Sequence, residues 1–287
     1  MNTISTKTYR DKYRLSTLDQ LLRKALVAEK ICMVDRSGAK TIQSPYGSQP
    51  ATTVQAIAGT YSTAAYTTTD DTLTVTDEFI VAEHIYDWEV ALTKFDIFAN
   101  RVDEMSFSVA AAIDKYVLNA ILEDANGAYT TPAGGFTTEA NIAEIMAELL
   151  AKVAGYAEMY KGTYLVIENT DIPGFIKAGA ASGFNFSDSV LKNGFMDVYM
   201  GVEIYVVRTG TFEDDAATTD SGSRTWTNLG HRMFGVKNTC TYAAPQGIKI
   251  EEKGVAGKTG KEVVVYGYIG AKVWYTKRDL TIDITLG

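Results

Sequence analysis

The chain has 287 residues, of which 46% are hydrophobic and 22% are charged, and its formal net charge is -8. A chain of this size can bury one large core or two modest ones, whereas its acidic balance argues against a general nucleic-acid binder, which needs surplus lysine and arginine to neutralise phosphate. No N-terminal apolar segment resembles a signal sequence and no apolar run approaches the roughly 18 residues of a membrane span, so we expect a folded, soluble protein, cytoplasmic at synthesis, with no membrane partner.

The first 40 residues are basic on an otherwise acidic chain. They hold nine basic and four acidic side chains, a balance of +5, so the remainder of the chain carries -13. Apolar residues from Leu15 to Val27 recur at helical spacing, with Ser16 or Thr17 available as an N-cap, and predict an amphipathic helix that ends near Lys30. The nine basic residues are Lys7, Arg10, Lys12, Arg14, Arg23, Lys24, Lys30, Arg36 and Lys40.

Two extended segments follow, with a loop between them. We expect a short strand at 40–45 that Pro45 ends, because proline cannot donate to a strand ladder. Residues 46–71 contain much threonine, alanine, serine and tyrosine, few charges and almost no bulky aliphatic side chains, so they cannot form a core of their own. We expect an extended, exposed loop or hairpin there, and one long strand over 72–86, where apolar residues alternate with polar ones.

The stretch 87–122 predicts a long helix. Its apolar side chains recur in steps of three and four, which defines one stripe of a helix, and neither glycine nor proline occurs between Gly59 and Gly127. A rod of roughly 50 Å, at about 1.5 Å per residue, and a core helix kinked near Ser106 both fit this pattern. The stripe comprises Trp88, Leu92, Phe95, Phe98, Val102, Met105, Val109, Ile113, Tyr116 and Ala120; the opposite, polar face comprises Lys94, Asp96, Arg101, Asp103, Glu104, Asp114, Lys115 and Asn119.

A second unit, of mixed helix and strand, is expected after the turn residues at 126–127 and 132–135. Its predicted elements are an amphipathic helix capped by Thr138, a buried strand at 163–168, a short helix that opens at Asp171, a strand at 200–207 and a solvated, mobile loop at 209–230. The remainder is expected to be all strand, because apolar residues alternate within 248–250, 263–273 and 280–286. No period of 20 to 50 residues repeats, which excludes a solenoid.

The few histidines and cysteines do not form a recognisable site. His84 and His231 are the only histidines, and we expect each to be a structural residue with its hydrogen bonds satisfied. Cys32 and Cys240 are too few and too separated in sequence for a zinc cluster or a disulfide framework, and are expected to be buried thiols.

Two motifs imitate ligand-binding loops without meeting their requirements. Gly257 to Thr259 resembles the end of a phosphate-binding loop, but Glu252 occupies the position of the required glycine and β-branched residues follow where a helix is needed. The acidic residues between Glu213 and Asp220 lack the spacing of a calcium loop. We therefore expect no catalytic residue, no metal site and no cofactor, and a protein that is not an enzyme.

The order of the elements resembles the phage major capsid proteins of the HK97 fold, an architecture that encapsulins share. The likeness spans nearly the whole chain, and the order of elements carries it more than any single motif. The stretches concerned are Lys24–Cys32 and Gly38–Pro45, similar to that family's arm and first strand; Thr72–Leu122, similar to its E-loop return and spine helix; Asn193–Val207, similar to the segment after the axial loop of the A domain; and Gly267–Trp274, similar to a late P-domain strand.

The resemblance implies an α+β chain with an N-terminal arm, an extended E-loop, a P domain made of the spine helix and antiparallel strands, and an α/β A domain. The implied boundaries are 1–45 for the arm and first strand, 46–76 for the E-loop, 77–126 with 241–287 for the P domain, and 127–240 for the A domain. E-loop residues would contact a neighbouring subunit, namely Val54, Ile57, Tyr61 and Tyr66. The basic arm, with Lys7, Arg10, Lys12, Arg14, Arg23 and Lys24, would face the lumen.

The implied function is that of a structural subunit that assembles into an icosahedral shell around viral DNA. Its expected partners are copies of itself in pentamers and hexamers, scaffolding and portal proteins, and packaged double-stranded DNA bound non-specifically. The expected location is the virion, assembled in the host cytoplasm. The alternative is an encapsulin-type compartment that binds cargo proteins.

The resemblance also predicts how the shell is held together. In capsids of this family that crosslink, an E-loop lysine attacks an asparagine of a neighbouring P domain. No lysine occurs between Lys40 and Lys94, and no asparagine occurs after Asn238. We therefore expect a shell without covalent links between subunits, stabilised by burial and hydrogen bonds.

Overall fold

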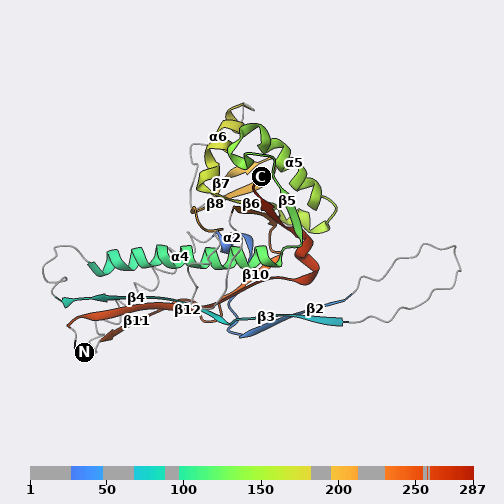
Figure 1. Ribbon diagram of the computed structural model, residues 1–287. Coiled ribbons are helices and arrows are strands. Elements are labelled where there is room, and N and C mark those ends of the chain that lie inside the picture. The colour runs from blue at the N-terminus through green and yellow to red at the C-terminus, as the bar shows by residue number, and fades with distance from the viewer. Residues whose placement is uncertain are drawn as a thin grey trace, which may run out of the picture.

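The structure, a computed structural model, describes residues 27–47, 68–87, 97–181, 195–212, 230–254, 257 and 259–287. Its described strands form sheets of five, six and two strands, and a long helix, α4, lies between the two larger sheets (Figure 1). This helix spans Ile97–Asp124 and confirms the later part of the helix predicted for 87–122. Residues 88–96 of that prediction lie outside the described residues. Within those residues, no helix is long and apolar enough to cross a membrane.

The five-stranded sheet is built around β12, whose 13 residues pair with three other strands. β12 is antiparallel to β10, β11 and β4, and β1 is added parallel to β10. One face of this sheet packs on α4, because alternate side chains of β12, including Val263 and Val265, share a core with Val109 and Ile113 of the helix. The strands are β1 (Met33–Asp35), β4 (Asp77–Ile85), β10 (Cys240–Ala243), β11 (Lys249–Gly254) and β12 (Lys261–Val273).

The six-stranded sheet has the order β5-β13-β9-β6-β8-β7 and is covered on both faces. All six residues of its strand β6 are buried because Leu165 and Ile167 join the core under α5 and α6, whereas Tyr164 and Val166 join the core of α4. The strands are β5 (Gly127–Thr130), β6 (Thr163–Glu168), β7 (Phe195–Tyr199), β8 (Val202–Val207), β9 (His231–Val236) and β13 (Thr281–Thr285); the helices are α5 (Glu139–Val153) and α6 (Ile172–Ala181).

In the described parts of the chain, five short helical segments connect these elements. α2 is a single turn before β1, and four 3₁₀ helices lie around the six-stranded sheet and before β13. Their bounds are α2 (Ala28–Ile31), η1 (Gly135–Thr137), η2 (Ala157–Lys161), η3 (Asn169–Asp171) and η4 (Tyr275–Leu280).

The third sheet is an antiparallel ribbon of β2 (Thr41–Gly47) and β3 (Thr68–Thr74) that extends away from the rest of the chain (Figure 1). Only its root is buried, where Leu73 and Val75 pack on Ala243 and Trp274. The prediction that Pro45 ends the first strand is wrong, because the strand continues to Gly47. Proline is tolerated there because β2 has a strand partner, β3, on one side only. The missing N–H of Pro45 therefore removes no hydrogen bond to a second neighbouring strand.

The predicted strand over 72–86 is two strands in different sheets. The apolar residues do alternate as predicted, but the chain leaves the ribbon after Thr74 and enters the five-stranded sheet at Asp77. An alternating pattern fixes which side chains face inward and does not fix which strand is the partner.

The predicted helices α5 and α6 and the predicted strands β6, β8, β11, β12 and β13 are confirmed. Thr138 takes the N-cap position of α5 without the predicted side-chain hydrogen bond, and most of the arm helix predicted to end near Lys30 lies outside the described residues. Five of the described strands were not predicted: β9 and β10, whose residues are buried without alternation, and the short strands β1, β5 and β7. The prediction of a solvated loop at 209–230 is wrong at its start, because Thr211 and Phe212 are buried, at 8% and 1% exposure. Residues 213–229 lie outside the described residues.

The polar face predicted for the long helix is exposed in part and buried in part. Arg101 and Glu104 are exposed as predicted. Asp114 and Asn119 are buried, at 8% and 0% exposure, because the second half of α4 is enclosed by sheets on both sides. Their burial is compensated by hydrogen bonds to backbone groups, which buried polar side chains require.

Candidate functional site: the arm junction and the link between the sheets

The arm junction, defined as residues 27–35, is bound to α4 by a buried carboxylate. Asp114 accepts hydrogen bonds from the backbone N–H groups of Val27, at 3.1 Å, and Ala28, at 2.9 Å. These donors lie at the start of α2, where a helix has no backbone acceptor of its own for them. Asp114 therefore supplies both acceptors and fixes the place where the arm junction meets α4.

The Asp114 carboxyl group titrates in an unusual range. Burial raises its pKa to about 7 from an ordinary value of 3.8, and this effect outweighs the hydrogen bonds from Ala28 and Val27 and the positive charge of Lys30. Burial also lowers the pKa of Lys30, against its attraction to Asp114. The arm junction is thus held by a group that changes charge near neutral pH.

The rest of the arm junction follows β10. The backbone N–H of Asn238 donates to the carbonyl oxygen of Ile31 at 2.9 Å, and β1 then pairs with β10 in parallel. Cys32 and Cys240 lie at this contact as free thiols, 4% and 0% exposed, so their predicted burial is confirmed.

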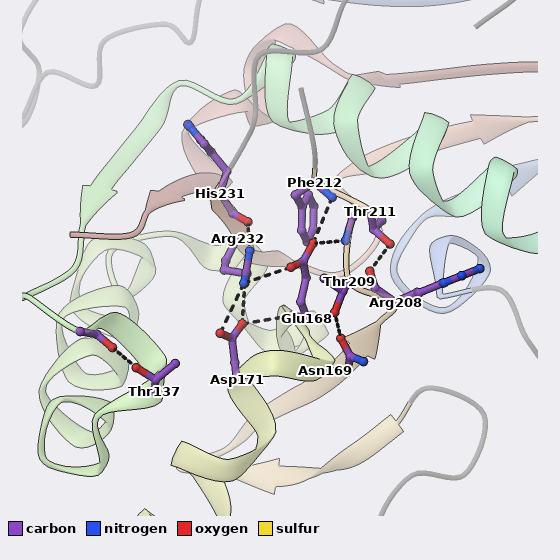
Figure 2. A network of polar contacts seen from close by, with 12 residues as sticks. Thr137, Glu168, Asn169, Asp171, Arg208, Thr209, Thr211, Phe212, His231 and Arg232 are labelled. Atoms are coloured by element: carbon purple, nitrogen blue, oxygen red, sulfur yellow. Dashed lines mark hydrogen bonds and ion pairs between the residues drawn. The ribbon is translucent and has the colours of Figure 1, made fainter. Parts of the chain in front are cut away.

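A buried ion-pair network joins strand β9 of the six-stranded sheet to the end of β6 and to η3 (Figure 2). Arg232 of β9 has its Nη2 3.2 Å from Glu168 Oε2 and 3.3 Å from Asp171 Oδ1, and its Nε also donates to Asp171. Nη1 donates to the carbonyl oxygen of His231 at 2.8 Å. All three charged side chains are less than 10% exposed, so every charge depends on its partner rather than on water.

Glu168 and Asn119 extend this network to α4. Glu168 Oε1 accepts hydrogen bonds from the backbone N–H groups of Gly210, at 3.1 Å, and Phe212, at 3.4 Å. Asn119 on α4 donates to the carbonyl oxygen of Thr211 at 2.7 Å. The segment 210–212 is therefore held between β6 and the long helix, and we refer to Arg232, Asp171, Glu168 and Asn119 as the polar link.

A second ion pair fixes the root of the ribbon. Lys272 of β12 donates to Asp71 and to the carbonyl oxygen of Thr72, and Asp71 also accepts from the backbone N–H of Tyr275 at 2.7 Å. Burial acts to raise the pKa of Asp71, but the hydrogen bonds from Lys272 and Tyr275 prevail and lower it. The ring of Tyr46 stacks on Tyr275 with centroids 4.9 Å apart. The ribbon thus has a defined direction where it leaves the five-stranded sheet.

The residues predicted to contact other molecules lie outside the described residues. This holds for the four E-loop residues Val54, Ile57, Tyr61 and Tyr66, and for the six basic arm residues Lys7, Arg10, Lys12, Arg14, Arg23 and Lys24. The described segments next to them in the chain are the ribbon and the arm junction.

Each of the two histidines has a polar neighbour in the described part of the chain. His231 Nδ1 lies 2.6 Å from Asp283, and His84 Nε2 lies 3.3 Å from the carbonyl oxygen of Thr259. The prediction of satisfied hydrogen bonds is wrong for His84, because its buried Nδ1 has no hydrogen-bond partner among the described residues. Among these residues, no group of three or more histidine, cysteine or acidic side chains could hold a metal. A pocket of about 420 Å³ at the root of the ribbon contains no acid and base pair; it is lined by Gly38, Lys40, Val75, Thr76, Pro245, Gln246 and Tyr268.

Comparison with known proteins identifies the fold. No model of a known protein family matches the sequence, and no curated protein matches it. The capsid of cyanophage P-SCSP1u matches with a TM-score of 0.68 at 15% identity, over 92% of this chain and 88% of that chain. A structure from Mycobacterium phage Che8 matches with a TM-score of 0.67 at 13% identity, over 90% of both chains.

The match extends beyond phages. The virus-like particle from Pyrococcus furiosus matches with a TM-score of 0.60 at 10% identity, over 94% of this chain and 96% of that chain. In each comparison nearly the whole of both chains is superposed, although few residues are identical. The chain therefore has the α+β, HK97-like fold of these structures, as its sequence predicted.

Proposed function

We propose that this chain is a major capsid protein, the repeated subunit of an icosahedral shell that encloses a viral DNA genome. The observation that carries this proposal is the superposition of nearly all of the chain on capsid structures such as that of cyanophage P-SCSP1u. A fold alone does not define a function. The proposal therefore also draws on features of this chain that require a neighbouring molecule.

The ribbon is the clearest of these features. Only Leu73 is buried among the residues of β2 and β3, and an isolated two-stranded ribbon is marginally stable in water. A projecting ribbon becomes stable when another molecule covers it. Residues 48–67 connect its strands, since Gly47 pairs with Thr68, and we propose that Val54, Ile57, Tyr61 and Tyr66 in that connection lie on the adjacent subunit.

The surface of the described residues also suits association. Large apolar side chains are exposed on separate elements, with Ile80 at 57% on β4, Phe107 at 61% on α4 and Tyr160 at 82% in η2. Single exposed apolar residues are common, but contacts on several sides of one subunit need such residues on several elements. A shell subunit has neighbours on several sides, and the exposed apolar residues of this chain fit such contacts.

We propose domains that follow the two larger sheets. The five-stranded sheet with α4 is the P domain, and the six-stranded sheet with α5 and α6 is the A domain. We propose a change to the predicted boundaries, which the pairing of β13 with β5 and β9 of the six-stranded sheet supports. Residues 281–285 then belong with the A domain rather than with the rest of 241–287.

The finer parts of the proposal concern partners and location. Subunits form pentamers and hexamers, with scaffolding and portal proteins taking part in assembly in the host cytoplasm, and the finished shell is part of the virion. The basic arm, including Lys7, Arg10, Lys12 and Arg14, faces the lumen and offsets the charge of packaged DNA, because lysine and arginine bind phosphate without sequence preference. An encapsulin-type shell for cargo proteins is not favoured by the comparisons.

Electron microscopy of the purified protein tests the proposal. The wild-type chain, co-expressed with the proteins of its neighbouring genes, should give closed particles of uniform diameter that sediment far ahead of the monomer. The matched control replaces residues 48–67 with Asn-Gly, a dipeptide suited to a tight hairpin turn. It should keep the circular dichroism of the wild type and lose the particles. A wild-type chain that stays monomeric under these conditions would refute the proposal.

A further inference from the structure

Cys32 and Cys240 lie side by side although 208 positions separate them in the sequence. Met33 pairs with Thr241 in the parallel ladder of β1 and β10, so the same register continued by one residue places Cys32 opposite Cys240. The backbone of Cys32 is extended, with φ -95° and ψ 158°, as this continuation requires. The two Sγ atoms are 2.9 Å apart.

This arrangement is close to that of a disulfide. Neighbouring strands lie about 4.8 Å apart, which is within the range of about 4.4 to 6.8 Å between the Cα atoms of bridged cysteines. The two sulfur atoms need to approach by less than about 1 Å to reach a bond length of about 2.05 Å. Hydrogen bonds hold both backbones in place, from Asn238 N–H to the Ile31 oxygen and from Cys32 N–H to the Ala28 oxygen.

We propose that Cys32 and Cys240 form an intrachain disulfide under oxidising conditions, and that this bond locks the arm junction onto β10. Without it, the arm junction is held by non-covalent contacts, which include the hydrogen bonds of Asp114 and Asn238, the β1 ladder, and the burial of Val27 and Ile31 against α4. The bond makes that attachment covalent and independent of the Asp114 charge. The disulfide can form in a single unassembled chain. That it stabilises the arm junction in a capsid released from the reducing host cytosol rests on the proposed function.

The reaction needs a low-molecular-weight disulfide such as glutathione disulfide as oxidant. One cysteine thiolate attacks a sulfur of that disulfide, which forms a mixed disulfide and releases one glutathione thiolate. The second cysteine thiolate then attacks the protein sulfur of the mixed disulfide and releases the second glutathione. The two cysteines lose two electrons and two protons, and these reduce one glutathione disulfide to two glutathione molecules.

The surroundings of the thiols determine when the bond forms. A reducing cytosol keeps such pairs as thiols, whereas an extracellular medium oxidises them. Burial, together with the hydrogen bond to Cys240, raises the pKa of Cys32 well above its ordinary value, so little of the reactive thiolate exists at neutral pH. Oxidation should therefore be slow in the folded chain and faster at alkaline pH.

Thiol trapping in glutathione buffers tests the inference on the purified full-length chain. After incubation with reduced glutathione, denaturation in a maleimide reagent should label both cysteines; after incubation with glutathione disulfide it should label neither. Tryptic digestion without reductant should then join the fragments 31–36 and 238–249. The oxidised chain should migrate as a compact monomer and unfold at a temperature higher by roughly 5 to 15 °C.

The variants Cys32→Ala and Cys240→Ala are the matched controls. Each should keep one thiol that maleimide labels after denaturation in either buffer, and neither should show the change in unfolding temperature. Two free thiols in the oxidised wild type, a stable glutathione adduct on either cysteine, or crosslinks between chains would each overturn the inference. Trapping needs no particles, so a chain that forms the disulfide but never assembles refutes the capsid function and leaves the disulfide standing.

Discussion

The Asp114 carboxylate on α4 accepts a hydrogen bond of 2.9 Å from the backbone N–H of Ala28, the first residue of α2. Because burial raises the pKa of Asp114 to about 7 from 3.8, the folded chain binds this proton more tightly than the unfolded chain. Between these two pKa values the folded state holds more protons, so the contribution of Asp114 to the free energy of unfolding falls as the pH rises.

The variant Asp114→Asn should remove this pH dependence, since its amide does not titrate. The free energy of unfolding of the wild type should fall relative to that of the variant between about pH 4 and pH 7, by at most about 1.4 kcal/mol per pH unit. Above that range the difference should be constant. Urea unfolding at a series of pH values measures both proteins, and parallel curves across the whole range would contradict the assignment.

The polar link should be far more sensitive to truncation than a surface ion pair. Arg232→Ala leaves the buried carboxylates of Glu168 and Asp171 without their cation, which should cost about 3 to 5 kcal/mol of unfolding free energy. Arg101→Ala is the matched control, because Arg101 pairs with Glu83 and Glu104 while its own side chain is 47% exposed.

That control should lose less than about 1 kcal/mol. Urea denaturation of the two variants and the wild type gives the comparison. Equal losses in the two variants would show that Arg232 is not held as the structure describes.

The ribbon should lose its anchor in Lys272→Met. The aliphatic chain is kept, but Asp71 and the Thr72 oxygen lose their shared donor, so amide hydrogens of β2 and β3 should exchange faster while those of β6 are unchanged. Lys261→Met on the same strand is the control, since its ion pair with Glu252 is 46% exposed on the lysine side. Equal exchange of the ribbon in both variants would contradict the anchor.

The same anchor has a predictable response to acid. Because its partners lower the pKa of Asp71, the stabilisation is complete above the unfolded pKa and is lost as the pH falls through the lower folded value. Ribbon exchange in the wild type should therefore approach that of Lys272→Met only in acid. A ribbon that loosens near neutral pH would instead implicate another group.

Assembled particles should contain no covalent bonds between subunits. The chain has no lysine between Lys40 and Lys94 and no asparagine after Asn238, so the loop lacks an amine and the final strands lack an amide target. Denaturing electrophoresis of mature particles with reductant should give one band at the monomer position. A ladder of oligomers that survives boiling and reductant would refute this prediction.

Local periodicity was sufficient to predict most elements. Spacing of three and four residues marks α5 and the described part of the long helix, and alternation marks β11, β12 and β13, because one buried face imposes the period of the backbone on the sequence. The order of those elements then predicted an HK97-like fold. Strands buried on both faces gave weaker signals, which explains why β9 and β10 were not predicted. The strands β1, β5 and β7 have only three to five residues each, too few to show a clear alternation.

The sequence carries a signal for the burial of part of the polar face of α4. Between Val109 and Leu122 apolar residues occur on all sides of the helix, which indicates a helix enclosed by other elements. That pattern predicts burial of Asp114 and Asn119. It does not identify their partners, since Val27 and Thr211 are 87 and 92 residues away from them.

Long-range pairing was decided only by the tertiary structure. The sequence determined the amphipathic helices, the inward faces of most strands, and the absence of the lysine and asparagine needed for crosslinking. It could not determine that β13 joins β5 and β9, that Arg232 meets Glu168 and Asp171, or that Cys32 faces Cys240. Each of these contacts joins residues far apart in sequence, and such contacts depend on which strands pair and in which register, whereas periodicity reports only which face of each strand is buried.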